Sequence, residues 1–438
     1  MTNFAELIYE ASENFLFIPF LAFFLGSVIL SFKTRFVQVR YMAYMFKILF
    51  QSFFKTKTKS QSKYTIQSHK ALFTAMATSI GIGNIVAPVI AIGFGGPGAL
   101  VGFLFAMFFG SAATFVEVTL AVKHRKEMDN GRILGGPMQY IKDHINSVLA
   151  IVYSSLAFIL IAVWESNQSN TLACLLEPYN IPSYFSGFLM SVVVVFALFG
   201  GIRRVGNITE KLVPAMFFLY SISGLIIIFL NADKLPEVIS LIFSSAFSFD
   251  SLKGTLLGVG TFKALRWGLA EGFYSNEAGV GVAPIPHSMT KTSDPFEQGI
   301  LSMVSVYSNG LLCMISGLLV LVTGVYSEPG AIFDINMIVK VFSNYFPGIG
   351  AIILSIAAIL FSFTTILGNG YNGGQCFLYV TKNRWMPWYY GLIGAIIFFG
   401  AIADVKMVWA ATDFFMIPVA LINIISIIYI SFKTDLIN

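Results

Sequence analysis

Helix-breaking and polar residues interrupt two long apolar segments of this 438-residue sequence. In the first segment, near residues 71–93, the interruption consists of Ser79, Gly81, Gly83, Asn84 and Pro88. In the second, near residues 255–287, it consists of Ser275, Asn276, Glu277, Gly279, Gly281, Pro284 and Pro286. Glycine and proline weaken a helix, and the backbone groups that they free within an apolar segment need a cavity or a ligand. The two interruptions therefore predict two broken helices beside a binding site.

The chemistry of such breaks suits a zwitterion. The N-terminal end of a half-helix presents free N–H groups and partial positive charge, which favour a carboxylate. Unwound carbonyls and half-helix C-terminal ends favour a sodium ion or an ammonium group. We therefore expect an amino acid to bind here, with a site built from Ser79, Gly81, Gly83, Asn84, Ser275 and Asn276 and walled by Phe273 and Tyr274. The alternative is that the glycines only allow close helix packing.

The composition indicates a membrane protein. Hydrophobic residues make up 56% of the chain and charged residues 11%, with a mean hydropathy of +0.78, whereas soluble domains carry about 25% charged residues. A helix needs about 20 residues to cross a bilayer, and eleven apolar blocks approach or exceed this length. They lie near residues 15–32, 71–93, 97–122, 145–166, 184–200, 212–231, 255–287, 297–325, 349–372, 387–403 and 408–432.

The distribution of Lys and Arg predicts the orientation of these blocks. With the 33–70 loop inside and alternation from there, 21 of the 27 basic residues fall on the cytoplasmic side. The positive-inside rule then places the N-terminus outside and the C-terminus in the cytoplasm of a cell inner (plasma) membrane. Within residues 34–70, Arg40 and Lys47 share one helical face, while Phe46 and Phe50 lie largely on the opposite, apolar face. We therefore expect a cytoplasmic amphipathic segment that contacts membrane lipids; the alternative is a flexible basic loop. Because the basic residues set topology, they do not indicate a nucleic-acid partner.

The two breaks lie in segments that start five helices apart and cross in opposite directions. Two interrupted helices in inverted halves are typical of secondary transporters. The sequence thus predicts an all-α integral membrane protein with about 11 transmembrane helices and a five-plus-five inverted repeat. Residues 1–33 form an extra helix, 34–70 the amphipathic segment, 71–231 the first repeat and 232–438 the second.

Several motifs carry a family resemblance. Residues 81–85 (GIGNI), 95–99 (GGPGA) and above all 274–287 (YSNEAGVGVAPIPH) match characteristic patterns, and further matches span residues 70–415. The chain resembles the alanine or glycine:cation symporter family, the sodium:alanine symporters. The family is similar in fold to the bacterial leucine transporter.

This resemblance implies sodium-coupled symport of a small neutral amino acid, alanine or glycine. It implies a sodium site at the Thr364 and Thr365 hydroxyls and at carbonyls near Ala77 and Ile80. It also places Gln168, with Asn170, on a helix that faces the substrate. The alternatives are a threonine that bonds its own helix backbone and a helix end exposed to water.

The chain departs from the family pattern at five positions. The differences that bear on the identity of the substrate are at Ile82, Ala87 and Asn369. Those that bear on the coupling ion are at Glu271 and Asn309. A proton-coupled carrier that uses Glu271 or Glu277 is therefore an alternative, as is a non-transporting sensor. An enzyme is not expected, because the four histidines lie near block ends and no hydrolase motif stands out.

Overall fold

The computed structural model describes residues 17–54, 64–128, 131–247, 262–292, 294–382 and 384–436. These residues are almost entirely helical, which confirms the predicted all-α class. Within them, one small hairpin pairs β1 (Lys126–Glu127) antiparallel with β2 (Ile133–Leu134), with Lys126 opposite Leu134. Predictions for residues 1–16, 55–63 and 248–261, which include the basic end of the amphipathic segment, lie outside the described residues.

The helices follow the predicted blocks closely. In the first half they are α2 (Phe17–Lys33), α3 (Val37–Arg40), α4 (Met42–Phe54), α5 (Ser68–Ser79), α6 (Gly83–Gly95), α7 (Ala99–Lys123), α8 (Pro137–His144), α9 (Ser147–Leu176), α10 (Ser183–Leu198) and α11 (Gly201–Leu230). In the second half they are α12 (Leu235–Phe247), α13 (Phe262–Asn276), α14 (Pro284–Ser288), α15 (Pro295–Thr323), α16 (Ile335–Tyr345), α17 (Gly350–Val380), α18 (Met386–Ile402) and α19 (Val405–Lys433). Short 3₁₀ turns occur at Glu177–Tyr179, Ala232–Lys234 and Val325–Ser327.

The predicted count of eleven spans is not confirmed. Within the described residues, six helices are long and apolar enough to cross a membrane: α7, α9, α11, α15, α17 and α19. Helices α5 and α6, which bend by 41° at their junction, make a seventh span if counted as one. The other apolar helices, such as α10 with 16 residues and α18 with 17, fall short of the roughly 20 residues that a perpendicular crossing needs.

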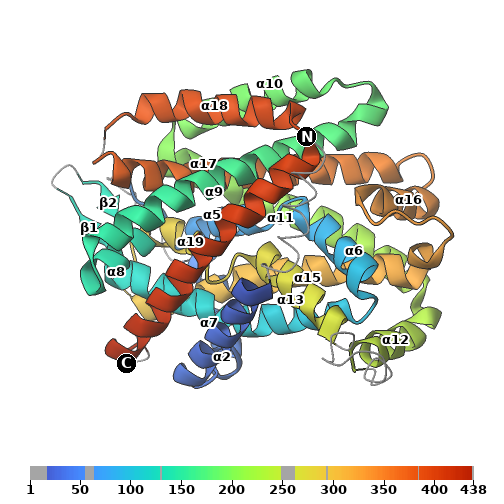
Figure 1. The fold of residues 1–438 in the computed structure, drawn as a ribbon, viewed down its shortest axis with the longest axis horizontal. Helices are drawn as coiled ribbons and strands as arrows, with labels where there is room; N and C mark the ends of the chain where they lie inside the picture. The colour runs from blue at the N-terminus through green and yellow to red at the C-terminus, as the bar shows by residue number, and fades with distance from the viewer. Residues whose placement is uncertain are drawn as a thin grey trace.

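The broken helices lie inside the bundle. Helix α7 packs along α13 and α15, while α9 packs along α17, α18 and α19. Helices α10 and α18 form an outer layer at the top of Figure 1. Helix α5 contacts α11, α15 and α17, and α6 contacts α13 and α15, so both halves of the first broken helix are enclosed by other helices.

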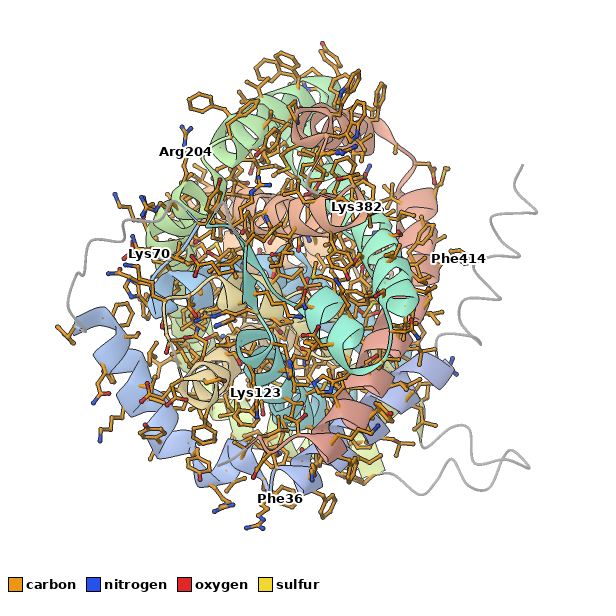
Figure 2. All side chains as sticks on the ribbon, turned by 90° about the vertical axis from the view of Figure 1, so that its left-hand side faces the viewer. Phe36, Lys70, Lys123, Arg204, Lys382 and Phe414 are labelled. Atoms are coloured by element: carbon orange, nitrogen blue, oxygen red, sulfur yellow. The ribbon has the colours of Figure 1, made fainter. Side chains whose placement is uncertain are left out.

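The outer surface is apolar and has one basic face. Large side chains such as Phe196, Phe229 and Phe399 are mostly exposed, as expected where lipid replaces water as the solvent. Figure 2 shows Lys70, Lys123, Arg204 and Lys382 on the face turned towards the viewer, which we call the basic face. All four belong to the set that the sequence predicts to be cytoplasmic.

Helix α4 covers part of this structure as a short amphipathic element. Its buried residues include Met45 and Ile48, and it packs on α15 and α5. The phenylalanines predicted to form its apolar face, Phe46 and Phe50, remain 51% and 64% exposed. The helix thus buries a different stripe against the protein and leaves the phenylalanines available to lipid.

Candidate functional site

The first break separates α5 from α6. Helix α5 ends at Ser79 and α6 begins at Gly83, with Ile80 in an extended conformation between them. Side chains satisfy the freed amides: Gly81 N–H donates to Asn84 Oδ1 at 2.8 Å, and Ile82 N–H donates to Gln168 Oε1 at 3.3 Å. A Cβ on Gly81 would lie 2.9 Å from Thr365 Oγ1. The close approach of the Thr365 and Gln168 side chains therefore leaves little room for a side chain at this position.

The second break separates α13 from α14. Helix α13 ends at Asn276 and α14 begins at Pro284. Glu277, Gly279 and Gly281 all have positive φ, a conformation that glycine adopts without strain. Asn276 holds the turn, because its Oδ1 accepts from Ala278 N–H and its Nδ2 donates to the Ala106 carbonyl.

A single asparagine of α15 connects the two breaks. Asn309 Nδ2 donates to the carbonyls of Ser79 at 2.7 Å and Ser275 at 2.8 Å. Ser275 Oγ in turn donates to Asn309 Oδ1 at 3.2 Å, and Asn84 Nδ2 donates to Ser275 Oγ at 3.3 Å. The sequence pointed to Asn309 only as a departure from the family. Its carbonyl and hydroxyl neighbours are the oxygen ligands that a hard cation prefers.

The two threonines predicted to bind sodium behave differently. Thr365 Oγ1 donates to the Ile80 carbonyl at 3.0 Å, directly at the first break. Thr364 Oγ1 donates to the Leu360 carbonyl of its own helix at 2.8 Å and lies 3.1 Å from Met216 Sδ. Only Thr365 and Ile80 of the four predicted positions are joined, and Ala77 is buried within α5.

A cavity of about 60 Å³ lies between the breaks. Its wall includes the predicted residues Ser79, Gly81, Gly83, Asn84, Gln168, Ser275 and Thr365. The remaining lining residues are Thr78, Ile82, Val86, Trp164, Asn167, Thr171, Tyr274, Glu277, Asn369 and Trp409. Trp164, Asn167 and Thr171 were missed by the sequence prediction. They repeat at helical spacing around Gln168, so periodicity applied to that residue would have found them.

Three residues predicted to contact the substrate lie outside the cavity wall. Of the two aromatic residues predicted to wall the pocket, Tyr274 lines the cavity, whereas Phe273 stacks on Phe23 of α2 with ring centroids 6.0 Å apart. The Asn276 side chain instead makes hydrogen bonds to the Ala278 amide and the Ala106 carbonyl. Asn170 donates to the Gly400 and Ala403 carbonyls, on the side of α9 that faces α18.

Several wall residues carry polar atoms without a protein partner. Within the described structure, Trp164 Nε1, Glu277 Oε2 and Asn369 Oδ1 are buried and make no hydrogen bond. Buried polar groups are nearly always paired in folded proteins. A donor and two acceptors in one wall are therefore consistent with a site that is completed by a polar ligand.

The fold is shared with known transporters. The structure of MhsT in complex with L-phenylalanine aligns with a TM-score of 0.61 at 14% identity, over 82% of this chain and 87% of the other. A mutant manganese transporter of Eremococcus coleocola aligns with a TM-score of 0.53 at 13% identity, over 81% and 75%. These alignments confirm the predicted leucine-transporter fold.

Sequence comparison identifies the family. The model of the sodium:alanine symporter family matches residues 1–435. The sodium/alanine symporter AgcS of Methanococcus maripaludis is 30% identical over 98% of this chain and 95% of its own length. The putative sodium/proton-dependent alanine carrier YrbD of Bacillus subtilis is 33% identical over 92% and 84%, and the probable sodium/glutamine symporter GlnT of the same organism is 32% identical over 92% and 83%. The chain is therefore a secondary transporter rather than an enzyme, and it belongs to the sodium:alanine symporter family.

Proposed function

We propose that the protein is a sodium-coupled symporter of a small neutral amino acid, alanine or glycine, that works by alternating access. The observation that carries this proposal is the cavity between the two helix breaks. Its wall includes the N-terminal end of α6, whose partial positive charge favours a carboxylate, and the unpartnered Glu277 Oε2 and Asn369 Oδ1, which suit an ammonium group. Both ends of a zwitterion thus find complementary groups within one enclosed space.

The size of the cavity supports a small substrate. One water-sized atom needs roughly 10–15 Å³ of such volume, so a cavity of about 60 Å³ accommodates only a handful of non-hydrogen atoms. Glycine and alanine are amino acids of that size. The apolar side chains of Ile82 and Val86 in the wall suit a short aliphatic side chain better than a charged one.

For sodium we propose a site at Thr365 Oγ1 and the Ile80 carbonyl. The ion would replace the hydrogen bond that now joins these two oxygens, and it would thereby fix the unwound segment that receives the substrate. Moving one charge inward through 100 mV supplies about 2.3 kcal/mol. A neutral zwitterion that moves with one sodium ion can therefore accumulate against its own gradient.

Proton coupling is the second candidate, and one observation favours it. Glu277 lies in the wall of the cavity, and its Oε2 has no partner in the described structure. A carboxyl in this position could bind either a proton or the substrate ammonium. Glu271, the other residue considered for this role, is not part of the cavity wall.

We further propose that the basic face is cytoplasmic and that the protein resides in the plasma membrane, with the N-terminus outside and the C-terminus inside. The clustering of Lys70, Lys123, Arg204 and Lys382 on one face supports this orientation.

Uptake into proteoliposomes tests the proposal. Labelled alanine is offered with an inward sodium gradient, and separately with an equal potassium gradient, at fixed pH. We expect accumulation only with sodium. Thr365→Ala should abolish it, because the ion loses its side-chain ligand. Thr364→Ala is the matched control and should retain uptake, because its hydroxyl points away from the break.

Other outcomes separate the candidates. Accumulation in both salts that follows a proton gradient and is lost in Glu277→Gln would establish proton coupling. Equal activity of the two threonine variants would refute the proposed ion site.

A further inference from the structure

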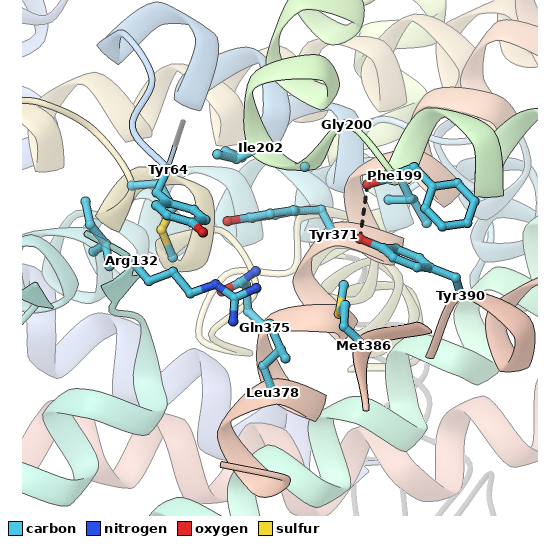
Figure 3. A pocket seen from close by; sticks show the side chains of 15 residues that line it. Tyr64, Arg132, Phe199, Gly200, Ile202, Tyr371, Gln375, Leu378, Met386 and Tyr390 are labelled. Atoms are coloured by element: carbon cyan, nitrogen blue, oxygen red, sulfur yellow. Dashed lines mark hydrogen bonds between the residues drawn. The ribbon is translucent and has the colours of Figure 1, made fainter. Parts of the chain in front are cut away.

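A second and larger cavity, of about 220 Å³, lies outside the candidate substrate site (Figure 3). It is enclosed by the start of α11, the second half of α17, the start of α18 and strand β2. Its wall consists of Tyr64, Arg132, Ile133, Leu198, Phe199, Gly200, Gly201, Ile202, Met289, Gly370, Tyr371, Gln375, Leu378, Met386 and Tyr390.

The wall has the chemistry of an anion site. Among the described residues that line it, Arg132 is the one charged residue. The Arg132 guanidinium lies over the Tyr64 ring, 5.6 Å from its centroid. A planar guanidinium with several N–H donors is well suited to a carboxylate.

Tyr371 provides an independent indication of a ligand. This residue is only 7% exposed, yet its hydroxyl makes no hydrogen bond within the described structure. Figure 3 shows Tyr371 and Gln375 of α17 extending into the same space as Tyr64 and Arg132, which come from two other segments of the chain. A buried phenol normally finds a partner, so a bound acceptor would complete this arrangement.

The N-terminal end of α11 adds partial positive charge to the cavity. The 30-residue helix α11 begins at Gly201, and Gly200, Gly201 and Ile202 line the cavity. The first amides of a helix have no partner within it and carry partial positive charge. In Figure 3 Arg132 and Gly200 lie on opposite sides of the Tyr371 ring. Because the Gly200 amide donates to the Ala197 carbonyl at 3.3 Å, this end of α11 contributes partial positive charge to the cavity rather than a free Gly200 donor.

The two cavities are consecutive along α17. Asn369 lines the candidate substrate cavity, and the next residue, Gly370, lines the second one. The lining residues Tyr371, Gln375 and Leu378 then continue along the helix towards Lys382 on the basic face. The second cavity therefore lies on the path from the substrate site to the side that we propose to be cytoplasmic.

We propose that this cavity is a second binding site for the transported amino acid, which holds its carboxylate at Arg132 and Tyr371 during release to the cytoplasm. This inference rests on the proposed function, because it takes the substrate to be an amino acid. The carboxylate would accept from the Arg132 guanidinium and from Tyr371 Oη–H, and Gln375 would meet the ammonium group through its side-chain carbonyl.

A cysteine-protection experiment tests the second site. Met386, a half-buried apolar residue of the wall, is replaced by cysteine in a Cys174→Ser background, because Cys174 is the exposed native thiol and the other two are buried. Inverted membrane vesicles in potassium gluconate are treated with an impermeant thiol reagent, with and without alanine. Omitting sodium leaves the first site without its coupling ion, so protection under these conditions reports on the second cavity.

We expect alanine to slow the labelling of Met386→Cys several-fold without sodium. Adding Arg132→Gln should abolish the protection, and adding Tyr371→Phe should raise the half-protecting concentration about tenfold, as for one hydrogen bond to a charged group. Lys126→Gln, which alters an exposed basic residue of the same face, is the matched control and should leave protection unchanged.

Three results would overturn the second site: no protection without sodium, full protection in the Arg132→Gln variant, or equal protection by chloride, which would indicate a site for inorganic anions. Sodium-driven uptake by the Met386→Cys variant in proteoliposomes is measured separately. Normal uptake without protection refutes only the second site, whereas absent uptake in every salt refutes the proposed function.

Discussion

Gly81 and Gly83 are separated by one residue but have different surroundings. A Cβ on Gly81 would lie 2.9 Å from Thr365 Oγ1 and 3.0 Å from Gln168 Nε2. A Cβ on Gly83 would meet no atom within 4 Å, because this residue faces the cavity. The first glycine therefore permits helix contact, and the second leaves space for the substrate.

This difference predicts opposite effects of the same substitution. Gly81→Ala should abolish alanine and glycine uptake alike, because the methyl group separates the first break from Thr365 and Gln168. Gly83→Ala should fold normally but shift preference from alanine to glycine, since one methyl group in a pocket changes selectivity about 10-fold or more. Competition between labelled glycine and unlabelled alanine measures the shift. An unchanged preference in Gly83→Ala would show that the substrate binds elsewhere.

The sequence predicts which residues lie near the site, but not the direction in which each side chain points. Residue types at the breaks pointed to Ser79, Asn84 and Ser275, and the structure places all three in the cavity wall. Thr364 and Thr365 could not be separated, because adjacent helical residues point about 100° apart and only the packing of α17 decides which one meets Ile80.

At the level of helices, Asn309 acts as a clamp between the two broken elements. Its amide donates to one carbonyl in each break. Replacement by leucine would leave both carbonyls without this partner, and interhelical hydrogen bonds in membranes contribute about 0.6 kcal/mol each. We expect transport to be affected more than stability, because without Asn309 the two broken helices would no longer be held in a fixed position relative to each other.

We therefore predict that Asn309→Leu lowers thermal stability slightly, by about 1 kcal/mol, but reduces the initial rate of uptake strongly. Cys313→Ala, one turn further along α15, is the matched control. Its thiol lies 3.2 Å from Ser275 Oγ but donates only weakly. Stability is followed by thermal unfolding in detergent. Comparable uptake by the two variants would contradict the role of Asn309 as a clamp.

The elements themselves were largely predictable. The eleven apolar blocks correspond to α2, the broken pairs and the long helices, because apolar length alone identifies a buried or lipid-facing helix. Helices α8, α12 and α16 were missed, since each has no more than 13 residues. Their positions depend on contacts with neighbouring helices rather than on length or hydropathy.

A histidine pair between α7 and α8 predicts a pH dependence of stability. His124 lies just beyond α7, and its Nε2 is 3.0 Å from His144 Nε2. Burial, together with the nearby His144, lowers the pKa of His124 to about 4. The unfolded chain therefore binds more protons than the folded protein between pH 6.5 and pH 4, so stability falls as the pH drops through this range. His124→Gln should flatten the decline in melting temperature between pH 7 and pH 5, and an equal slope in both proteins would contradict the assignment.

For the whole molecule, the orientation and the repeats remain predictions. Helices α5 to α11 fall within the predicted first repeat, 71–231 apart from its first residues, and α12 to α19 within the second, 232–438. The structure adds that the predicted cytoplasmic residues of Figure 2 share one face. Counting Lys and Arg residues in the loops could not have shown this, because the count assigns each loop to one side of the membrane but does not place it within the fold.

The orientation can be tested with a native cysteine. Helix α9 begins at Ser147, next to the basic α7–α8 region, and its 30 residues extend about 45 Å, more than the hydrocarbon thickness of about 30 Å. Cys174, near its other end, is exposed, whereas Cys313 and Cys376 are buried. We predict that an impermeant thiol reagent labels Cys174 in intact cells. Lys126→Cys in a Cys174→Ser background should instead react only in inverted vesicles, because Lys126 lies in the hairpin that follows α7. The reverse pattern would invert the topology and would make the second cavity an entrance rather than an exit.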